Sequence, residues 1–447
     1  MRSAEPVVTG WGRLGVPGVE VRSTNLERLS ESAVLSRGLG RSYGDSSLPP
    51  PGVREVIGTA LADRLLAFDP ETGLLRAEAG TSLLALNRLF LERGWFVPVT
   101  PGTQFVTLGG MVASDVHGKD HHVHGCFGEH VTRLKMRVPD GRVLWCSDTE
   151  HPDLFRATIG GMGLTGHILE VEVPLRRIRS PWIQQESVRV DDLDGFLAAL
   201  GDAAKRLPYT MGWIDCLKRG RGMGRGILMA GDWASPDVAP SKFPAPHLRP
   251  TLPFDLPSWL LGRFSVAAFN EAYFRSHVAR RREGIVHWES FFYPLDIVDE
   301  WNRMYGKRGF TQYQCVVPEK QRPGAARRVL EILTRAGGAS FLCVIKDCGP
   351  EGKGMLSFPM EGVSIALDIP VRDATQALVD QLNEQVIREG GRIYLTKDGF
   401  TRPEHFRAME PRLPAFLDVR RKWDPEGKIR SAQSVRLFGD AAAPSGR

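Results

Sequence analysis

The chain has 447 residues, of which 42% are hydrophobic and 25% are charged, and this length and composition are typical of a globular protein with two domains. The formal net charge of +6 predicts a modestly basic surface, but no Lys/Arg run is interleaved with aromatic residues, which argues against nucleic-acid binding. The six cysteines form no CxxC pair, no run of about 18 apolar residues occurs, and the N-terminal residues lack the layout of a signal peptide. We therefore expect a protein of a reducing compartment, without a membrane-spanning helix and without a signal peptide.

The N-terminal part, residues 20–178, is predicted to consist of short strands and turns with one clear helix. That helix spans residues 82–93, where leucines at helical spacing form an apolar face. Residues 134–138 and 143–146 flank the turn sequence Pro-Asp-Gly-Arg and predict a β-hairpin. A further strand is expected over residues 168–173.

From residue 179 onward, strand-like runs alternate with helices, which predicts a sheet backed by helices. Helices are expected at 193–200 and 323–336, with Pro323 in the first turn of the second helix and Gly337 at its end. Prolines exclude a long helix from most of residues 232–264. This segment is either a surface loop on the sheet or a mobile lid whose apolar side faces lipid. Residues 441–447 are expected to form a disordered tail.

Three glycine-rich segments carry the functional information. The first, residues 36–45 (SRGLGRSYGD), directly follows the apolar run Ala33-Val34-Leu35. The second spans residues 101–122 (PGTQFVTLGGMVASDVHGKDHH) and the third spans residues 160–168 (GGMGLTGHI). Glycines after a strand allow tight turns and bring backbone N–H groups close to an anion, and arginine adds charge to the same site.

The spacing of these glycines is neither that of a Rossmann fingerprint nor that of a Walker loop. One such loop alone is equally well explained as an ordinary turn. Three loops that converge on one site predict an extended, phosphate-bearing cofactor that lies between short β-elements.

In this order, the three segments resemble the FAD-binding half of flavoproteins of the vanillyl-alcohol-oxidase type. Five further motifs are similar to the decaprenylphosphoryl-β-D-ribose 2′-oxidase family within that superfamily: TGWGR at 9–13, EWNR at 300–303, QYQ at 312–314, LSFP at 356–359 and YLTKD at 394–398. The resemblance covers nearly the whole chain. It implies an α+β fold with a PCMH-type FAD-binding domain over residues 1–178 and a substrate domain over 179–391, built on an antiparallel sheet backed by helices. Residues 392–447 would then return to complete the FAD domain.

The resemblance assigns FAD binding to residues of the three glycine-rich segments and to one tyrosine beyond them. These residues are Ser36, Arg37, Gly38, Leu39, Gly40, Arg41, Ser42, Tyr43, Gly44, Asp45, Ser46, Gly102, Thr107, Leu108, Gly109, Gly110, His117, Gly118, Lys119, Ile168 and Tyr394.

Oxidation of an alcohol by a flavin also needs a group that takes or stabilises the hydroxyl proton as the hydride leaves. The resemblance points first to Lys397, then to Tyr43 and His117, as catalytic residues. A lysine at this place can hold the substrate as an ammonium, polarise the flavin or act as a base. The alternatives are a surface lysine at the end of a strand and, for His117, a satisfied interior histidine. The implied substrate wall consists of Trp213, Gln312, Gln314, Lys346, Ser364, Ala366 and Lys397.

Two positions depart from the patterns of related enzymes. Arg41 stands where sugar-lactone and alditol oxidases place a histidine that carries the flavin covalently, so we expect non-covalent FAD. Ala366 stands where the family often has a cysteine in the substrate pocket, and Ser364 replaces a larger amide, so substrate placement differs. His121, His122 and His124 lack a carboxylate or cysteine partner at metal-ligand spacing, and no metal is expected.

The implied reaction is oxidation of the C2′ hydroxyl of a polyprenyl-phosphoryl-β-D-ribofuranose to the 2-keto sugar. A short-chain NAD(P)H-dependent reductase would then complete epimerisation to the arabinose form. Two alternatives remain: an FAD-dependent oxidase of a soluble sugar, alditol or aldonolactone, and a flavin-binding protein without catalysis. We expect the enzyme in the cytoplasm or at the periphery of the inner membrane, its periplasmic face included. Leu256, Trp259, Leu260 and Leu261, with the basic clusters 218–221 and 280–282, would contact the lipid.

Overall fold

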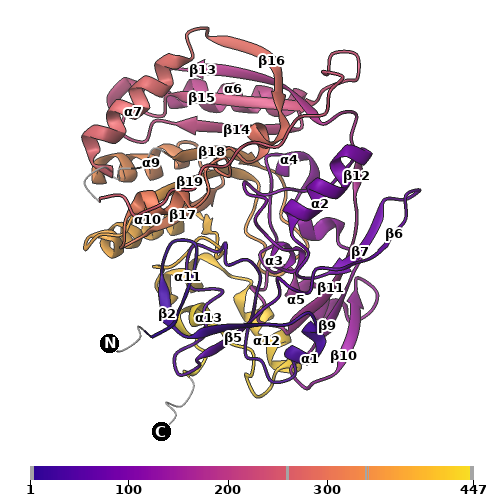
Figure 1. The fold of residues 1–447 in the computed structure, drawn as a ribbon. Helices are drawn as coiled ribbons and strands as arrows, with labels where there is room; N and C mark the ends of the chain where they lie inside the picture. Colours follow the sequence, from indigo (N-terminus) through magenta and orange to yellow (C-terminus); the bar gives the residue numbers. More distant parts are fainter. Residues whose placement is uncertain (1–4, 258–260, 338–339, 341, 443–447) are drawn as a thin grey trace.

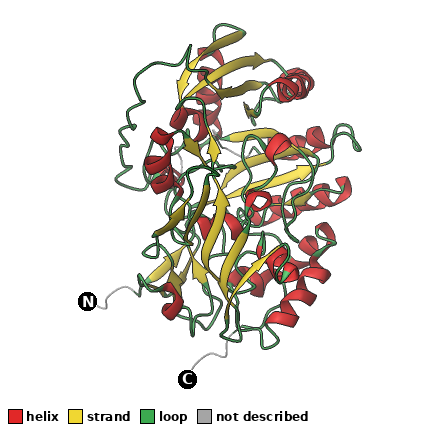
Figure 2. Cartoon of the chain, turned by 90° about the vertical axis from the view of Figure 1, so that its right-hand side faces the viewer, coloured by secondary structure: helices red, strands yellow, loops and turns green. Residues whose placement is uncertain are grey.

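A computed structural model describes residues 5–257, 261–337, 340 and 342–442. The elements form two halves, one above the other in Figure 1, and the C-terminal helices lie beside the N-terminal strands in the lower half. In the perpendicular view, strands make up much of the interior of both halves and helices lie mainly at the periphery (Figure 2). The fold is therefore α+β.

The lower half contains short strands in several small sheets. Its largest sheet has five antiparallel strands in the order β10-β9-β11-β7-β6. A second, parallel sheet has the order β3-β5-β4, and the pairs β1-β2 and β12-β8 complete the half. The bounds of these strands are β1 Val7–Thr9, β2 Gly15–Pro17, β3 Val19–Arg22, β4 Ser36–Arg37, β5 Glu55–Gly58, β6 Leu65–Phe68, β7 Leu74–Glu78, β8 Trp95–Phe96, β9 Arg133–Arg137, β10 Val143–Ser147, β11 His167–Pro174 and β12 Arg176–Arg177.

Short helices connect these strands and cover them. The helices are α1 Leu26–Leu29, α2 Leu83–Phe90, α3 Leu108–Ala113, α4 His121–His124 and α5 Pro152–Thr158. Ser82 caps α2 by accepting a hydrogen bond from the Ala85 N–H, and a 3₁₀ turn over Leu91–Arg93 continues the helix. The predicted helix over residues 82–93 is thus confirmed, as are the hairpin β9-β10 and the strand β11.

The upper half is built on one antiparallel sheet of eight strands in the order β16-β13-β15-β14-β18-β19-β17-β20. The strands are β13 Trp182–Val190, β14 Tyr209–Ile214, β15 Gly226–Trp233, β16 Arg281–His287, β17 Phe310–Val317, β18 Cys343–Cys348, β19 Gly362–Pro370 and β20 Arg392–Ile393. Helices α6 Leu193–Arg206, α9 Ala325–Ala336 and α10 Thr375–Glu389 back this sheet, while α7 Arg263–Ser276 and α8 Trp288–Phe292 flank it.

The period-two alternation of strand side chains decides which residues face the helices and which face the lower half. On β17, Tyr313 and Cys315 belong to the helix-covered core, whereas Gln312 and Gln314 point the other way. The same alternation places Ile345 of β18 in the core and Lys346 on the opposite face. A row of polar side chains is thereby presented to the lower half.

Beyond β20, three helices return to the lower half: α11 Pro403–Met409, α12 Leu413–Trp423 and α13 Ala432–Leu437. Phe406, Phe416 and Leu437 form one apolar cluster with Ala157 of α5 and Leu164 of the third glycine-rich segment. Burial of these side chains holds the C-terminal helices against the lower half. The domain boundaries at residues 178 and 391 stay a prediction.

Some sequence predictions differ from the structure in extent. Helix α6 continues to Arg206, beyond the predicted end at residue 200. Helix α9 begins at Ala325 with Gly324 as its N-cap, so Pro323 precedes the helix and does not lie in its first turn, while Gly337 ends it in the left-handed conformation, as expected. The predicted disordered tail falls largely on residues 443–447, which lie outside the described residues.

The described part of the proline-rich loop, defined here as residues 235–257, contains turns and an isolated bridge at Thr251 but no helix. Trp259 and Leu260, expected to contact lipid, lie outside the described residues. All six cysteines lie among the described residues and are buried, and no disulfide bond joins them. Within the described ranges, every helix is too short or too polar to span a bilayer.

Candidate active site

A cavity of about 320 Å³ lies where the two halves meet, lined by residues of both. The lower half contributes the three glycine-rich segments, and the upper half contributes the polar face of its sheet through β17, β18 and β19. The segment 394–397, just after β20, also reaches the cavity. Residues far apart in the chain therefore converge on one site.

The parallel strands β4 and β5 explain how the first glycine-rich segment reaches this cavity. Parallel pairing puts the carboxyl ends of both strands at the same edge, so the residues after Arg37 and Gly58 emerge together. Gly40 has φ +65°, and a Cβ there would lie 2.0 Å from the Arg37 guanidinium. The turn therefore needs glycine at position 40 to keep its backbone folded beside the cavity.

Several buried polar atoms that line this part of the cavity have no partner among the described residues. They are Nη1 of Arg37, Nε of Arg41 and the hydroxyls of Ser46, Ser47 and Thr59. Buried polar groups are normally hydrogen-bonded, and an unpartnered set facing one cavity fits a polar ligand. Two guanidinium groups and three hydroxyls suit the pyrophosphate and ribityl oxygens of FAD.

Arg41 is held by aromatic rings. Its guanidinium carbon lies 3.7 Å from the centroid of the Trp11 ring and 4.8 Å from that of Phe105. Burial lowers its pKa, and nearby Asp296 and Glu300 oppose this shift. The side chain stays a cation facing the cavity.

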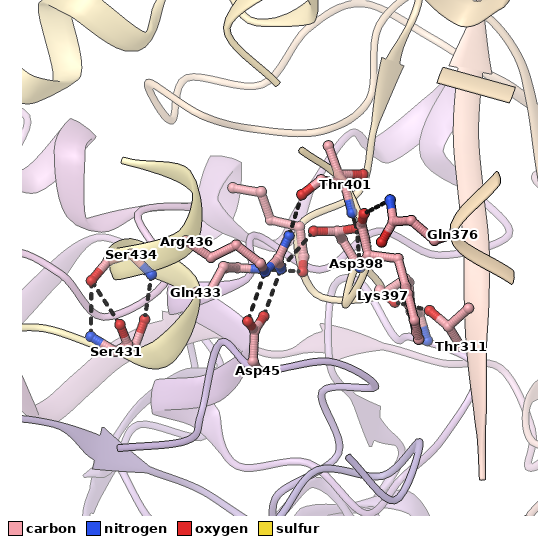
Figure 3. A network of polar contacts seen from close by, with 12 residues as sticks. Asp45, Thr311, Gln376, Lys397, Asp398, Thr401, Ser431, Gln433, Ser434 and Arg436 are labelled. Atoms are coloured by element: carbon pink, nitrogen blue, oxygen red, sulfur yellow. Dashed lines mark hydrogen bonds and ion pairs between the residues drawn. The ribbon is translucent and has the colours of Figure 1, made fainter. Parts of the chain in front are cut away.

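Lys397 lies in the turn after β20 and lines the same cavity. Its Nζ lies 3.8 Å from the centroid of the Tyr43 ring. The two segments also share a backbone hydrogen bond, from the Tyr43 N–H to the Thr396 carbonyl at 2.9 Å. Thr311 of β17 donates to the Lys397 carbonyl at 3.4 Å (Figure 3). Lys397 is therefore fixed from both halves.

Burial dominates the electrostatics of Lys397 and lowers its pKa to about 7. Asp368 opposes the shift, and another cavity lysine, Lys346, adds to it. Asp368 accepts hydrogen bonds from Gln312 Nε2 at 2.6 Å and from the Tyr305 hydroxyl at 2.9 Å, and burial raises its own pKa to about 6. Lys397 is thus poised to exchange a proton near neutral pH.

His117 is buried and lines the cavity. Gln314 Nε2 donates to its Nε2 at 3.0 Å, which leaves the ring proton on Nδ1. Burial, with Lys346 nearby, holds the pKa of His117 well below its usual value, so the ring is neutral. Tyr394 packs against this ring, and its hydroxyl donates to the Ser114 carbonyl at 2.9 Å.

Most of the sequence-predicted site residues line the cavity, and five do not. Leu108 is buried in the core of the lower half. Asp45 forms an ion pair with Arg436, and Gly44 packs against Asp398. Ser364 is not in the cavity lining, and its hydroxyl accepts a hydrogen bond at 3.4 Å from Nε2 of Gln314, which is.

Trp213 is the fifth exception, and its position has a physical reason. It lies on the same face of β14 as Met211, which does line the cavity. Two residues further along the strand, however, Phe274 and Tyr273 of α7 cover this face and pack against Trp213. Helix α7 thus covers the residue that the resemblance implied for the substrate wall.

Other cavity residues were missed. Thr59 and Ser47 bring unpartnered hydroxyls, Trp11 and Phe105 hold Arg41, and Met211 adds an apolar side chain from β14. Thr59 comes just after β5, whose apolar residues Val56 and Ile57 predict a strand. If that strand had been paired in parallel with the one before the first glycine-rich segment, Thr59 would have been placed at the same edge. Met211 carries no such signal.

One cluster of possible metal ligands occurs among the described residues, formed by His247, His287 and Glu289 outside the cavity. Its groups already have protein partners. His287 accepts from the Glu289 N–H and contacts the Ala245 carbonyl, and Glu289 forms an ion pair with Arg249 at 2.7 Å. These contacts join the proline-rich loop to α8 and explain the cluster without a metal.

Comparison with known proteins identifies the cofactor. Residues 28–147, which contain the first two glycine-rich segments and the strands around them, match the FAD binding domain family. Together with the cradle of unpartnered polar atoms, this match defines the chain as an FAD-dependent oxidoreductase. FAD is the cofactor of this protein.

Three curated proteins illustrate the similarity. The chain is 35% identical over 448 residues to decaprenylphosphoryl-β-D-ribose oxidase of Mycolicibacterium smegmatis, with 96% of each chain covered. It is 34% identical to an uncharacterized protein of Streptomyces coelicolor, over 80% of this chain and 99% of the relative. A putative D-arabinono-1,4-lactone oxidase of Neurospora crassa is 33% identical over only 33% of this chain and 26% of its own. The chain belongs to the decaprenylphosphoryl-β-D-ribose oxidase family.

Proposed function

We propose that this enzyme oxidises the C2′ hydroxyl of a polyprenyl-phosphoryl-β-D-ribofuranose to the 2-keto sugar. The observation that carries the proposal is the end-to-end match to an oxidase named for decaprenylphosphoryl-β-D-ribose. It is combined with a cavity that is lined by three lysines, a neutral histidine and two glutamines. The product is the intermediate from which reduction on the opposite face gives the arabinose form.

The chemistry assigned to the chain is proton transfer and positioning. FAD, when bound, supplies the acceptor for the hydride. Lys397 in its amine form takes the C2′ hydroxyl proton, since burial lowers its pKa to about 7. Gln312 and Gln314, both on the cavity face of β17, orient the sugar hydroxyls. His117 donates from Nδ1, and Lys346 donates from Nζ on the same face of the sheet as the two glutamines.

We further propose that FAD is held without a covalent bond to residue 41. An arginine offers no ring nitrogen for a flavin link, and the Arg41 guanidinium is stacked on Trp11. This supports the polyprenyl-phosphoryl sugar over a lactone or alditol as substrate. Acid precipitation of the purified yellow protein should release intact FAD into the supernatant. Flavin that remains with the precipitated polypeptide would contradict the proposal.

Epimerisation requires a second enzyme, because the keto sugar must be reduced by a separate hydride donor. We propose a short-chain NAD(P)H-dependent reductase as this partner. The lipid substrate also requires access from a membrane, so we propose a peripheral contact made by the proline-rich loop and the start of α7. The bridge between Thr251 and Asp299 supports this placement, since Asp299 lines the cavity.

The substrate is tested by anaerobic bleaching of the flavin absorbance. Polyprenyl-phosphoryl-β-D-ribose should bleach the flavin rapidly, while free ribose, alditols and aldonolactones should bleach it slowly or not at all. Faster bleaching by a soluble lactone would replace the proposed substrate. A flavin that none of the sugars bleaches would favour the non-catalytic alternative.

A further inference from the structure

Two irregular segments of the chain set the position of Lys397 relative to Tyr43. Tyr43 lies in the turn region after β4, and Lys397 lies in the turn after β20, so neither belongs to a helix or a strand. Their direct backbone link is the hydrogen bond from the Tyr43 N–H to the Thr396 carbonyl. A single hydrogen bond between two turns contributes modestly to order, so further contacts must hold this geometry.

The two segments approach each other closely. A Cβ at Gly44 would lie 1.7 Å from the Asp398 carbonyl oxygen, which only glycine allows. The neighbours of the two cavity residues, Asp45 and Asp398, thereby bring their carboxylates to the same place. Two buried carboxylates this close repel each other unless a cation lies between them.

Arg436 of α13 provides that cation (Figure 3). Its Nε and Nη2 donate to the two carboxylate oxygens of Asp45 at 2.8 and 2.7 Å, and Nη2 also donates to Asp398 at 2.8 Å. Nη1 donates to the Thr401 carbonyl. One guanidinium group thus cross-links the Tyr43 segment to the Lys397 segment, in the bidentate geometry that arginine favours.

The start of α13 aims this side chain. Ser431 and Ser434 form a reciprocal capping box that fixes the first turn of the helix. Gln433 and Arg436 are three residues apart and therefore share one helix face. Gln433 donates to the Leu395 carbonyl at 2.8 Å, so both side chains bind the segment that carries Lys397.

We propose that Arg436 is a positioning residue, which holds the Lys397 ammonium against the Tyr43 ring by cross-linking Asp45 and Asp398. It lies outside the cavity lining and acts through the two segments it joins. Its loss lets the Lys397 turn move away from Tyr43 and lets water reach the lysine. The inference deepens the proposed function, because it rests on Lys397 as the proton acceptor, but the geometry requires no particular sugar.

The test measures the titration of Lys397 itself in the FAD-loaded protein. Competitive labelling with acetic anhydride at a series of pH values, with mass spectrometry of the peptide that contains Lys397, gives the pKa without any substrate. Arg436→Lys keeps the charge but loses the fork of donors. Arg420→Lys is the control, since the Arg420 side chain, 6% exposed against 24% for Arg436, also binds a carboxylate through two hydrogen bonds, to Asp440 at 2.7 and 2.8 Å, away from Lys397 and Tyr43.

Arg436→Lys should raise the pKa of Lys397 by about one unit or more toward its value in water, and Arg420→Lys should leave it unchanged. Flavin reduction should slow in Arg436→Lys, with FAD content and KM close to wild type. If both variants titrate like wild type, Arg436 is merely structural and the proposal is overturned.

Asp45→Asn is a second variant, which tests the proposal if the arginine variants do not fold. It removes one carboxylate while the pair between Arg436 and Asp398 stays, and it should raise the pKa of Lys397 in the same direction. An unchanged titration in folded Asp45→Asn would also overturn the proposal. A wrong substrate assignment would appear differently, as a wild-type flavin that the lipid sugar does not bleach while Lys397 still titrates near neutrality.

Discussion

At the scale of single residues, the cavity is lined by three lysines whose surroundings differ, Lys119, Lys346 and Lys397. Lys397 faces the Tyr43 ring and the Asp368 carboxylate, whereas Lys346 Nζ donates to the Gly118 carbonyl at 3.2 Å. Burial lowers the pKa of all three lysines, that of Lys119 and Lys397 to about 7, and the charge of Lys346 adds to both of these shifts. Lys119 Nζ donates to the Phe291 and Phe292 carbonyls, which leaves Lys397, beside Tyr43 and Asp368, as the proposed proton acceptor.

Replacement of Lys397 by methionine tests its role directly. Lys397→Met keeps the length of the side chain and leaves the glycine-rich segments untouched, so FAD should remain bound. Loss of a positioned proton acceptor should slow flavin reduction about 10²–10⁴-fold. Stopped-flow bleaching of the flavin measures the rate. Lys353→Met is the control, since this lysine forms an ion pair with Asp148 outside the cavity and should have no effect. A Lys397→Met enzyme of normal rate would remove Lys397 from the mechanism.

The pH dependence of flavin reduction follows from the same residue. Only the amine form of Lys397 accepts a proton, and this form becomes populated as the pH rises through about 7. The rate should therefore increase with pH across neutrality, and it should lose this limb in Lys397→Arg, because arginine does not deprotonate. Single-turnover reduction at each pH is the measurement. A rate that falls as the pH rises through neutrality would assign the ammonium form to catalysis.

At the scale of elements, the turn after β4, which contains Gly44, depends on close contact with the turn after β20. Gly44→Ala would drive a methyl group into the Asp398 carbonyl, at 1.7 Å, and should destabilise the protein by about 1–3 kcal/mol.

Apart from its chain neighbours, no atom of the described residues lies within 4 Å of a Cβ placed at Gly102, which lines the cavity. Gly102→Ala should therefore keep its stability and weaken FAD binding instead.

Urea unfolding of the FAD-free proteins and titration with FAD separate the two effects. Equal stability of Gly44→Ala and wild type would contradict the close approach. Unchanged FAD affinity in Gly102→Ala would show that the flavin does not pass beside this residue. The two substitutions add the same methyl group, so any difference between their effects on stability and FAD affinity comes from the position of the residue.

The elements that carry a strong local signal were predictable from the sequence. The helix α2 has apolar residues at helical spacing and a serine cap, and the hairpin β9-β10 has a turn sequence between two apolar runs. Helix α7 was missed because its apolar residues follow the prolines at 246–257 and leave much of the helix exposed. Arg436 was also missed, since its role comes from contacts with residues 391 and 38 positions away, which no local pattern encodes.

The same distinction holds for the site. The glycine-rich segments are contiguous in the sequence, so the resemblance could name most of the residues that line this part of the cavity. The substrate wall depends on how eight strands align, and that alignment puts Ser364 behind Gln314 and lets α7 cover Trp213. Long-range packing, which the sequence pattern does not specify, decides these positions.

At the scale of the whole molecule, exposed apolar side chains gather on one stretch of the chain. Leu248 is 94% exposed, Phe254 62% and Phe264 91%, and all three lie in the proline-rich loop or at the start of α7. The loop runs beside residues 299–303, and Leu261 joins Tyr43 and Trp301 in one apolar cluster. The exposed side chains therefore belong to a segment that runs beside residues lining the cavity. The tail of the proposed lipid substrate would leave the cavity there.

Two of the basic residues expected to assist at this surface form ion pairs. Arg280 forms an ion pair with Asp191, and Arg281 forms one with Glu186 at 2.7 Å. In the proposed membrane contact these two residues would attract anionic lipid less strongly than the sequence suggested, and burial of apolar surface would provide more of the affinity. Salt should consequently have only a small effect on binding to vesicles.

Substitution of the exposed side chains tests the membrane contact. Leu248→Ser with Phe264→Ser should weaken binding to liposomes, because burial of each side chain contributes about 1.5–3 kcal/mol, or roughly tenfold or more in affinity. The apparent KM for a long-chain lipid substrate should rise, while turnover of a short, soluble prenyl analogue should stay unchanged. Leu61→Ser with Leu89→Ser is the control, since these leucines are 47% and 42% exposed elsewhere on the molecule. Equal loss on both substrates would mean that the loop shapes the cavity itself, and a wild-type protein that ignores liposomes would exclude the contact.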